Sequence, residues 1–153
     1  MSISNAMCNS YKTELFSGTH LAADVYKLVL IKVGATGTYD GTVTNGGTPG
    51  SGTPSAANIG TDEVAASGTY ASGGLTLSGF SATLQGTTAV LDFTTPVATG
   101  ATISAIGGVI INTTRSNKAV GTFTFGGTIT STAGSFTCTM PTVGSGTSLL
   151  RIA

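Results

Sequence analysis

Charged side chains are rare in this sequence, and their signs balance. Only 8% of the 153 residues are Asp, Glu, Lys or Arg, six basic against six acidic, so the formal net charge is zero. Six scattered Lys and Arg residues cannot form a basic surface that neutralises phosphates, which argues against nucleic-acid binding. Disorder is also disfavoured, because 40% of the residues are hydrophobic and disordered chains are apolar-poor and highly charged.

Strong helix formers and long apolar runs are missing too. The chain has 23 Gly and 29 Thr, both weak helix formers, which excludes a helical bundle. The most apolar stretch, residues 25–33, is interrupted by Lys27 and Lys32 and is too short to span a bilayer. Residues 1–18 show no apolar core of a signal peptide. We therefore expect a protein made in a cytoplasm and without membrane contact.

Few residues here could support metal or thiol chemistry. Cys8 and Cys138 are the only cysteines, too few for a secreted disulfide scaffold, so we expect two reduced thiols. His20 is the only histidine, and it shows no zinc-ligand spacing with the cysteines. A Cys8–His20 nucleophilic pair is the remaining catalytic reading of these residues. Trp is absent, so a sugar-stacking platform would depend on Tyr and Phe.

The acidic residues offer no clear catalytic pair. They are Glu14, Asp24, Asp40, Asp62, Glu63 and Asp92. Only Asp62 and Glu63 are adjacent, and neighbouring residues of a strand point to opposite faces, whereas glycoside hydrolysis needs two facing carboxylates. The Gly-rich residues 46–52 lack the Lys of a phosphate-binding loop. We predict that the protein is not an enzyme, and we assign no catalytic, cofactor-binding or metal-binding residue.

One helix is predicted, over residues 5–17. Asn5 is suited to cap it, and Gly18 to end it. Met7, Tyr11 and Leu15 recur at the spacing of one helix face. This helical arm, residues 1–18, either docks on a partner or covers the end of the protein's own sandwich.

Beyond Gly18 the pattern is that of strands. Residues 25–33 are apolar on both faces, which is typical of a central strand. Residues 34–61 are predicted to form a long flexible loop, either an exposed tip or a clamp. Further strands are predicted at 64–71, 75–84, 88–93, 101–112, 118–125, 128–132, 135–140 and 148–152. The sequence therefore predicts one all-β domain over residues 1–153, an antiparallel β-sandwich or jelly-roll-like fold with one short N-terminal helix.

Five segments of the sequence, in this order, carry a resemblance to a known group of proteins. They are NAMCNSYKTELFSGTH, VYKLVLIKVGAT, DEVAASGTYASGGLTL, AVLDFTTPVATGATISAIGGVIIN and AVGTFTFGGTITSTAGSFTCTMP. The most specific pieces are Cys8-Asn9-Ser10 with Lys12 and Glu14-Leu15, Gly68-Thr69-Tyr70 with Gly73-Gly74, and Phe125-Gly126-Gly127. Together they resemble a group of small tailed-phage virion proteins, the capsid decoration or cement proteins. The sequence departs from this group at 34–61 and at 94–100.

The resemblance implies a structural virion protein without a cofactor. Such a protein binds the outside of an assembled phage head, where subunits of the major capsid protein meet, after synthesis in the cytoplasm of a bacterial host. Decoration sites lie on local symmetry axes, so a closed homo-oligomer, a trimer or a dimer, is expected. The alternatives are a tail, collar or head-fibre subunit that acts as an adhesin, a sugar-binding module, and a small hydrolase that uses Cys8 and His20.

Overall fold

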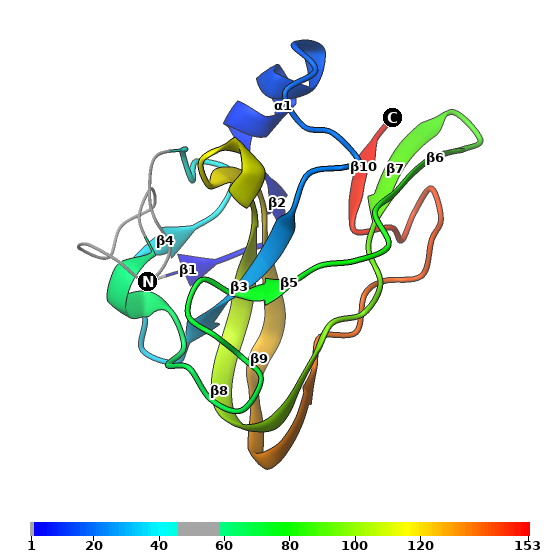
Figure 1. Cartoon of the computed structure of the whole chain (residues 1–153). Coiled ribbons are helices and arrows are strands. Elements are labelled where there is room, and N and C mark those ends of the chain that lie inside the picture. Colours follow the sequence, from blue (N-terminus) through cyan, green and yellow to red (C-terminus); the bar gives the residue numbers. More distant parts are fainter. Residues whose placement is uncertain (1, 46–58) are drawn as a thin grey trace.

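The computed structural model describes residues 2–45 and 59–153, and most of its regular structure is antiparallel sheet (Figure 1). The larger sheet has five strands in the order β2 (Ala6–Met7), β9 (Lys118–Thr137), β8 (Val97–Asn112), β3 (Tyr26–Lys32) and β5 (Leu75–Thr76). A second sheet has the order β10 (Leu150–Ile152), β7 (Thr88–Asp92) and β6 (Ser81–Gln85). The remaining pair is parallel and joins β1 (Ser2–Ile3) to β4 (Thr38–Tyr39). The helical elements are α1 (Asn9–Phe16) and the short 3-10 turns η1 (Gly60–Asp62) and η2 (Thr113–Arg115).

The predicted fold class, an antiparallel all-β sandwich with one short N-terminal helix, is confirmed. Its core lies against β3, whose residues Leu28–Ile31 are buried. Such a strand reads as continuously apolar because both of its faces are covered, and the prediction of a central strand at 25–33 is correct within one residue at each end. No helix within 2–45 and 59–153 is long and apolar enough to cross a membrane.

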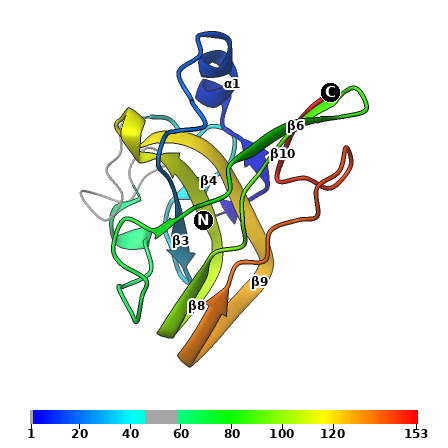
Figure 2. The ribbon, with the colours of Figure 1, turned by 45° about the vertical axis from the view of Figure 1, so that its right-hand side comes forward.

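Strands β6, β7 and β10 form an arm that projects from the main sheet. In Figures 1 and 2 the arm lies apart from the long β8–β9 ribbon, and the C-terminus lies beside it. Three aromatic rings connect the two parts: Tyr26 of β3 has its ring centroid 5.4 Å from that of Phe80 and 5.3 Å from that of Phe93. Phe80 directly precedes β6 and Phe93 directly follows β7, so both lie at the base of the hairpin, with ring centroids 5.7 Å apart. The hairpin is therefore fixed at its base by packing.

The predicted helix is shorter than expected, because its first turn is taken by a strand. Ala6 and Met7 pair with β9 instead of entering the helix. The expected cap, Asn5, instead accepts a hydrogen bond at Oδ1 from the backbone N–H of Thr124, at 2.9 Å. Cys8 stands at the N-cap position without a side-chain capping bond. The prediction of a helix end at Gly18 is correct within two residues, and Gly18 has a φ of +66°.

The predicted loop 34–61 is wrong at both of its ends. Residues 38–39 form β4, and residues 60–61 belong to η1. The buried carboxylate of Asp62, the last residue of η1, ties the two ends together. It accepts hydrogen bonds from three residues in and just before β4: Thr36, Gly37 and Tyr39. Residues 46–58 lie outside the described residues, so the middle of this prediction stays untested.

Two of the predicted strands are also wrong. Residues 64–71 form no strand: Ser67–Tyr70 is a tight turn closed by a single bridge, because Gly68, at a φ of +57°, reverses the chain. Residues 75–84 split between β5 in the main sheet and β6 in the arm, with Gly79 at a φ of +66° between them. Both glycines break the extended conformation that the side-chain pattern alone predicts.

Three other predicted strands are one strand. The segments 118–125 and 128–132 and the first half of 135–140 lie on β9, which pairs with β8 over nearly its whole length. The register shifts between Ala105 and Gly107, opposite Gly126 and Gly127. These glycines mark an irregularity of the ladder and not a chain reversal, as glycines in bulges do. The strand predicted at 88–93 matches β7 within one residue. The strands predicted at 101–112 and 148–152 correspond to β8 and β10, but β8 begins four residues earlier, at Val97, and β10 two residues later, at Leu150.

Candidate functional site

His20 lies in a buried polar network beneath α1. Its Nε2 is 2.6 Å from Oε2 of Glu14, and its Nδ1 is 3.1 Å from the amide nitrogen of Asn112. A neutral imidazole with its proton on Nε2 satisfies both contacts, donating to the carboxylate and accepting from the amide. The ring also packs against Tyr11 in a tilted arrangement, with centroids 4.5 Å apart. Both ring nitrogens are thus engaged in holding α1 against the sheet.

The same network extends to both sides of His20. Oε1 of Glu14 accepts a hydrogen bond at 2.8 Å from Lys118, the first residue of β9. Asp24 accepts from Asn112 at 2.9 Å and from Nε of Arg115 at 2.9 Å. Hydrogen bonding from Arg115 holds the pKa of Asp24 well below its usual range. The charged groups in this region stabilise the junction between α1, the loop after it and the β8–β9 turn.

The two cysteines are free, buried and far from nucleophilic. Burial raises the pKa of both the Cys8 and the Cys138 thiols to about 12. A nucleophilic cysteine needs a thiolate, which a lowered pKa would supply. The contacts of His20 are to Glu14 and Asn112 and not to Cys8. The structure does not bring the Cys8–His20 pair together as a catalytic unit.

The adjacent carboxylates Asp62 and Glu63 serve different parts of the chain. Asp62 binds the segment after β3, and its hydrogen bonds lower its pKa although burial alone would raise it. Glu63 accepts from the hydroxyl of Tyr70 at 2.9 Å and from the N–H of Gly73 at 2.7 Å. The two carboxylates thus do not face each other, as predicted. They are separated because Asp62 belongs to a 3-10 turn, and not because the pair lies on a strand. Each carboxylate organises a turn of the backbone.

Metal-binding side chains do not cluster in the described parts of the chain. No three His, Cys, Asp or Glu side chains within 2–45 and 59–153 gather as a metal ion would require. Asp92 is buried, and its Oδ1 accepts from the backbone N–H of Leu149 at 2.9 Å. That bond ties the end of β7 to the segment before β10, so this carboxylate also has a structural partner.

The surface that stands out is an apolar row across the arm. Leu84 of β6 and Ile152 of β10 are both cross-strand neighbours of Ala89 on β7. Side chains so placed lie on the same face, with Leu84 and Ile152 each about 5 Å from Ala89, which lies between them. All three are exposed, Leu84 at 68% and Ile152 at 48%. We call Leu84, Ala89 and Ile152 the apolar row.

The apolar row continues the core outward. The next row on the same face consists of Ala82, Leu91 and Leu150. Leu91 and Leu150 are buried members of the hydrophobic core. The arm therefore carries one apolar face, of which the inner part is covered by the body and the outer part faces solvent. Two exposed large apolar side chains in one row, continuous with the core, make this face a candidate contact surface.

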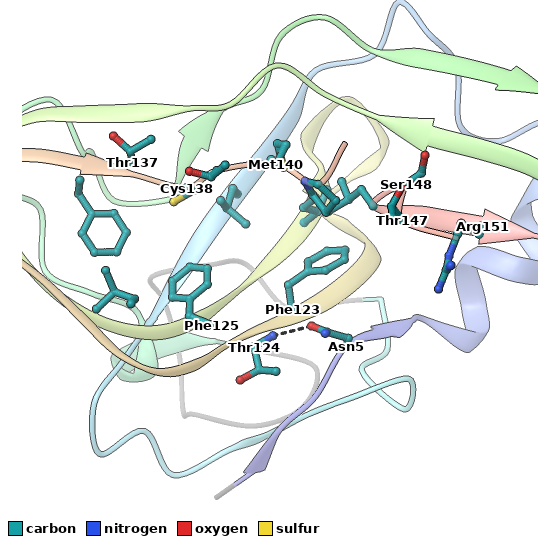
Figure 3. Close-up of a pocket in the computed structure, with 17 residues that line it drawn as sticks. Asn5, Phe123, Thr124, Phe125, Thr137, Cys138, Met140, Thr147, Ser148 and Arg151 are labelled. Atoms are coloured by element: carbon teal, nitrogen blue, oxygen red, sulfur yellow. Dashed lines mark hydrogen bonds between the residues drawn. The ribbon is translucent and has the colours of Figure 1, made fainter. Parts of the chain in front are cut away.

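A pocket of about 510 Å³ lies between β9 and the C-terminal segment (Figure 3). Phe123 and Phe125 of β9 line it on one side, Met140 lies across from them (Figure 3), and Leu149 is also among the lining residues. Thr122 of the same strand is buried, and its hydroxyl donates a hydrogen bond to the carbonyl of Ser4 at 2.9 Å. The pocket is where the C-terminal segment packs loosely on the sheet.

The described part of the N-terminal arm, residues 2–18, mainly covers the protein's own sandwich. Cys8 and Tyr11 are buried, and Met7 and Leu15 pack against the core. Phe16, at the end of α1, is 96% exposed and is the exception. Sequence reasoning did not find the apolar row. Leu84 and Ile152 are 68 positions apart, and only strand pairing through β7 makes them neighbours.

No protein family, no curated protein and no solved structure matches this chain.

Proposed function

We propose that this protein is a structural virion protein that decorates the outer surface of an assembled phage head. In this role it binds the major capsid protein across capsomer junctions and stabilises them. The apolar row of the arm is the observation that carries the proposal, because it is a preformed contact surface on a chain with almost no charge. The segments quoted above, which resemble capsid decoration proteins, support the same assignment.

The mechanism is mechanical. A protein that binds the assembled shell, and not the free capsid subunits, stabilises the assembled state by linkage. Repetition over the capsid lattice makes many weak contacts collectively strong. A rigid all-β body suits this task, since its chemically reactive side chains are used to fix turns and the α1 junction. The virion exterior is the proposed location.

The apolar row can be tested by head binding. Ile152→Asp places a charge at one end of the apolar row. We expect the apparent affinity of this variant for heads assembled without the protein to be about tenfold or more below that of the unchanged protein, which is the loss typical of an interface anchor. Val143→Asp is the matched control: Val143 is 54% exposed but lies outside the arm, so this variant should bind as the unchanged protein does. Equal loss in both variants, or in neither, would contradict the role of the row.

Electron cryo-microscopy of the intact particle tests the function itself. The proposal requires density for this protein at capsomer junctions, in lattice stoichiometry. Density confined to the tail, the collar or one vertex would overturn it and support the fibre or adhesin alternative. Absence from the particle would exclude every virion role.

A further inference from the structure

Strand β6 is an open edge of the arm. Its partner β7 occupies one side, and no strand within residues 2–45 and 59–153 pairs with the other. Natural edge strands are usually blunted by Lys, Pro or a bulge. Strand β6 reads SATLQ, has none of these, and exposes its three middle residues. Such an edge is a template for another strand.

The hairpin register shows which backbone groups face outward. Gln85 and Thr88 flank a two-residue turn, and such a flanking pair exchanges both backbone hydrogen bonds. Alternation along the strand then directs the bonds of Thr83 toward β7 as well. The N–H and C=O groups of Ala82 and Leu84 are left pointing to the open side.

We propose that β6 pairs antiparallel with β6 of a second copy, about a two-fold axis at Thr83. In this register Ala82 lies opposite Leu84 of the second copy, and each such pair exchanges both backbone bonds. The two Thr83 side chains meet at the axis, and Thr–Thr pairs are favourable across strands. Because β6 contains no charge, no like charges are opposed, which is what a self-complementary interface requires.

The side chains support the same register. A two-fold axis normal to the sheet keeps the apolar face of both arms on one side. Leu84, the most exposed member of the apolar row, then has Ala82 of the second copy beside it. The exposed row of one arm is thus continued by the Ala82–Leu91–Leu150 row of the other. The two arms form one six-stranded sheet with a continuous apolar face.

A cysteine at the axis tests this arrangement. Residues in a non-hydrogen-bonded antiparallel pair have Cα atoms about 4.5 Å apart, within the range that a disulfide bridges. Thr83→Cys should therefore form a disulfide-linked dimer under mild oxidation, with twice the chain mass of 15.0 kDa. The native cysteines are buried and stay in place.

Thr87→Cys is the matched control. Thr87 is exposed in the adjacent turn, and in the proposed dimer its two copies lie more than about 20 Å apart. This variant should remain uncrosslinked. Equal crosslinking of both variants, or none in Thr83→Cys, would overturn the proposal.

Charge exchange gives a second, reversible test. Thr83→Lys and Thr83→Glu each oppose like charges at the axis, so each alone should be a monomer by light scattering at concentrations where the unchanged protein is a dimer. An equimolar mixture should regain the dimer mass. A trimer of the unchanged protein, a monomer at every concentration, or a mixture that stays monomeric would overturn the proposal.

The dimer and the proposed capsid role can fail separately. Thr83 lies on the face of β6 opposite the apolar row, so its variants leave the row unchanged. An unchanged protein that is a monomer at every concentration but still binds heads would reject only the edge pairing. Loss of head binding in Ile152→Asp with an intact dimer would bear only on the docking surface.

Discussion

Asp62 is the residue whose charge the fold uses most fully. Its buried carboxylate accepts bonds from the N–H of Thr36 at 2.8 Å, the N–H of Gly37 at 2.7 Å and the hydroxyl of Tyr39 at 2.7 Å. Asp62→Asn replaces one acceptor oxygen by a donor. We expect a loss of about 1–3 kcal/mol in the free energy of unfolding at pH 7, measured by chemical denaturation.

The pH dependence follows from the direction of the shift. The pKa of Asp62 is lowered in the folded state, so its stabilisation is complete above the unfolded value of about 3.9 and is lost as the pH falls through the folded pKa. Asp62→Asn should therefore lose less stability between pH 5 and pH 3 than the unchanged protein. Asp40→Asn is the comparison: hydrogen bonds from Thr42 also lower the pKa of Asp40, but they close only a local turn, so its effect should be smaller. An equal effect of both substitutions would reject the special role of Asp62.

Gly68 and Gly86 allow two effects of an added side chain to be compared: backbone strain at a positive φ, and steric overlap with neighbouring atoms. Both have a positive φ, +57° and +64°, so alanine is strained at either position, by about 1–2 kcal/mol. A Cβ at Gly86 meets nothing within 4 Å, whereas one at Gly68 overlaps the carbonyl oxygen of Thr99. Gly68→Ala should therefore cost about 1–3 kcal/mol more than Gly86→Ala. Thermal denaturation of the two variants measures the difference, and equal losses would contradict the tight packing at Gly68.

At the scale of elements, the turn between β8 and β9 is joined to the α1 region by Asn112. This buried residue donates to Asp24 at 2.9 Å and accepts from the N–H of Arg115 at 3.3 Å. Asn112→Ala leaves buried partners unpaired, at a cost of about 1–3 kcal/mol. We expect faster amide hydrogen exchange in residues 19–25 and 113–118, with the centre of β8 less affected.

Thr114 provides the comparison for that experiment. Its hydroxyl accepts from the N–H of Val25 at 2.8 Å, but at an exposed position where water can replace it. Thr114→Ala should therefore change exchange and stability less than Asn112→Ala. The opposite order would show that the buried network is not what holds the two segments together.

The elements differ in how far the sequence predicts them. Strand β3 was predictable because a strand buried on both faces is apolar without interruption. The glycines of the β8–β9 ladder were not, because a Gly pair has the same sequence signature in a turn and in a bulge. The helix start was missed since Ala6 and Met7 gain more from pairing with β9 than helix propensity indicates.

The apolar row could not be predicted from the sequence, for a different reason. Each residue of the apolar row lies in a short segment whose partner is not encoded locally. The pairings of β7 with β6 and with β10 span very different distances along the chain. A similar limit applies to Glu14 and Lys118, 104 positions apart, whose contact supports α1. Periodicity predicts which face of a strand is apolar, but not which strands lie next to each other.

At the scale of the whole molecule, the arm and the main sheet are separate layers connected through a small aromatic cluster. Tyr26, Phe80 and Phe93 form this joint. A docking surface on a projecting arm transmits force to the body only if the joint is stiff. The packing of the three rings is therefore as relevant to the proposed capsid role as the apolar row itself.

Phe80→Ala tests that joint. Phe80 is partly buried against the core, so removing its ring should cost about 1–3 kcal/mol, less than at a fully buried site. We expect the loss to be local: the amides of residues 81–92 exchange faster, while those of the β8–β9 ladder keep their protection, because the ladder does not depend on the joint. Phe16→Ala is the control, since Phe16 is 96% exposed and should leave both regions unchanged. Uniform loss of protection in Phe80→Ala would instead mean that arm and body unfold as one unit, and the three rings would then not be a local joint between them.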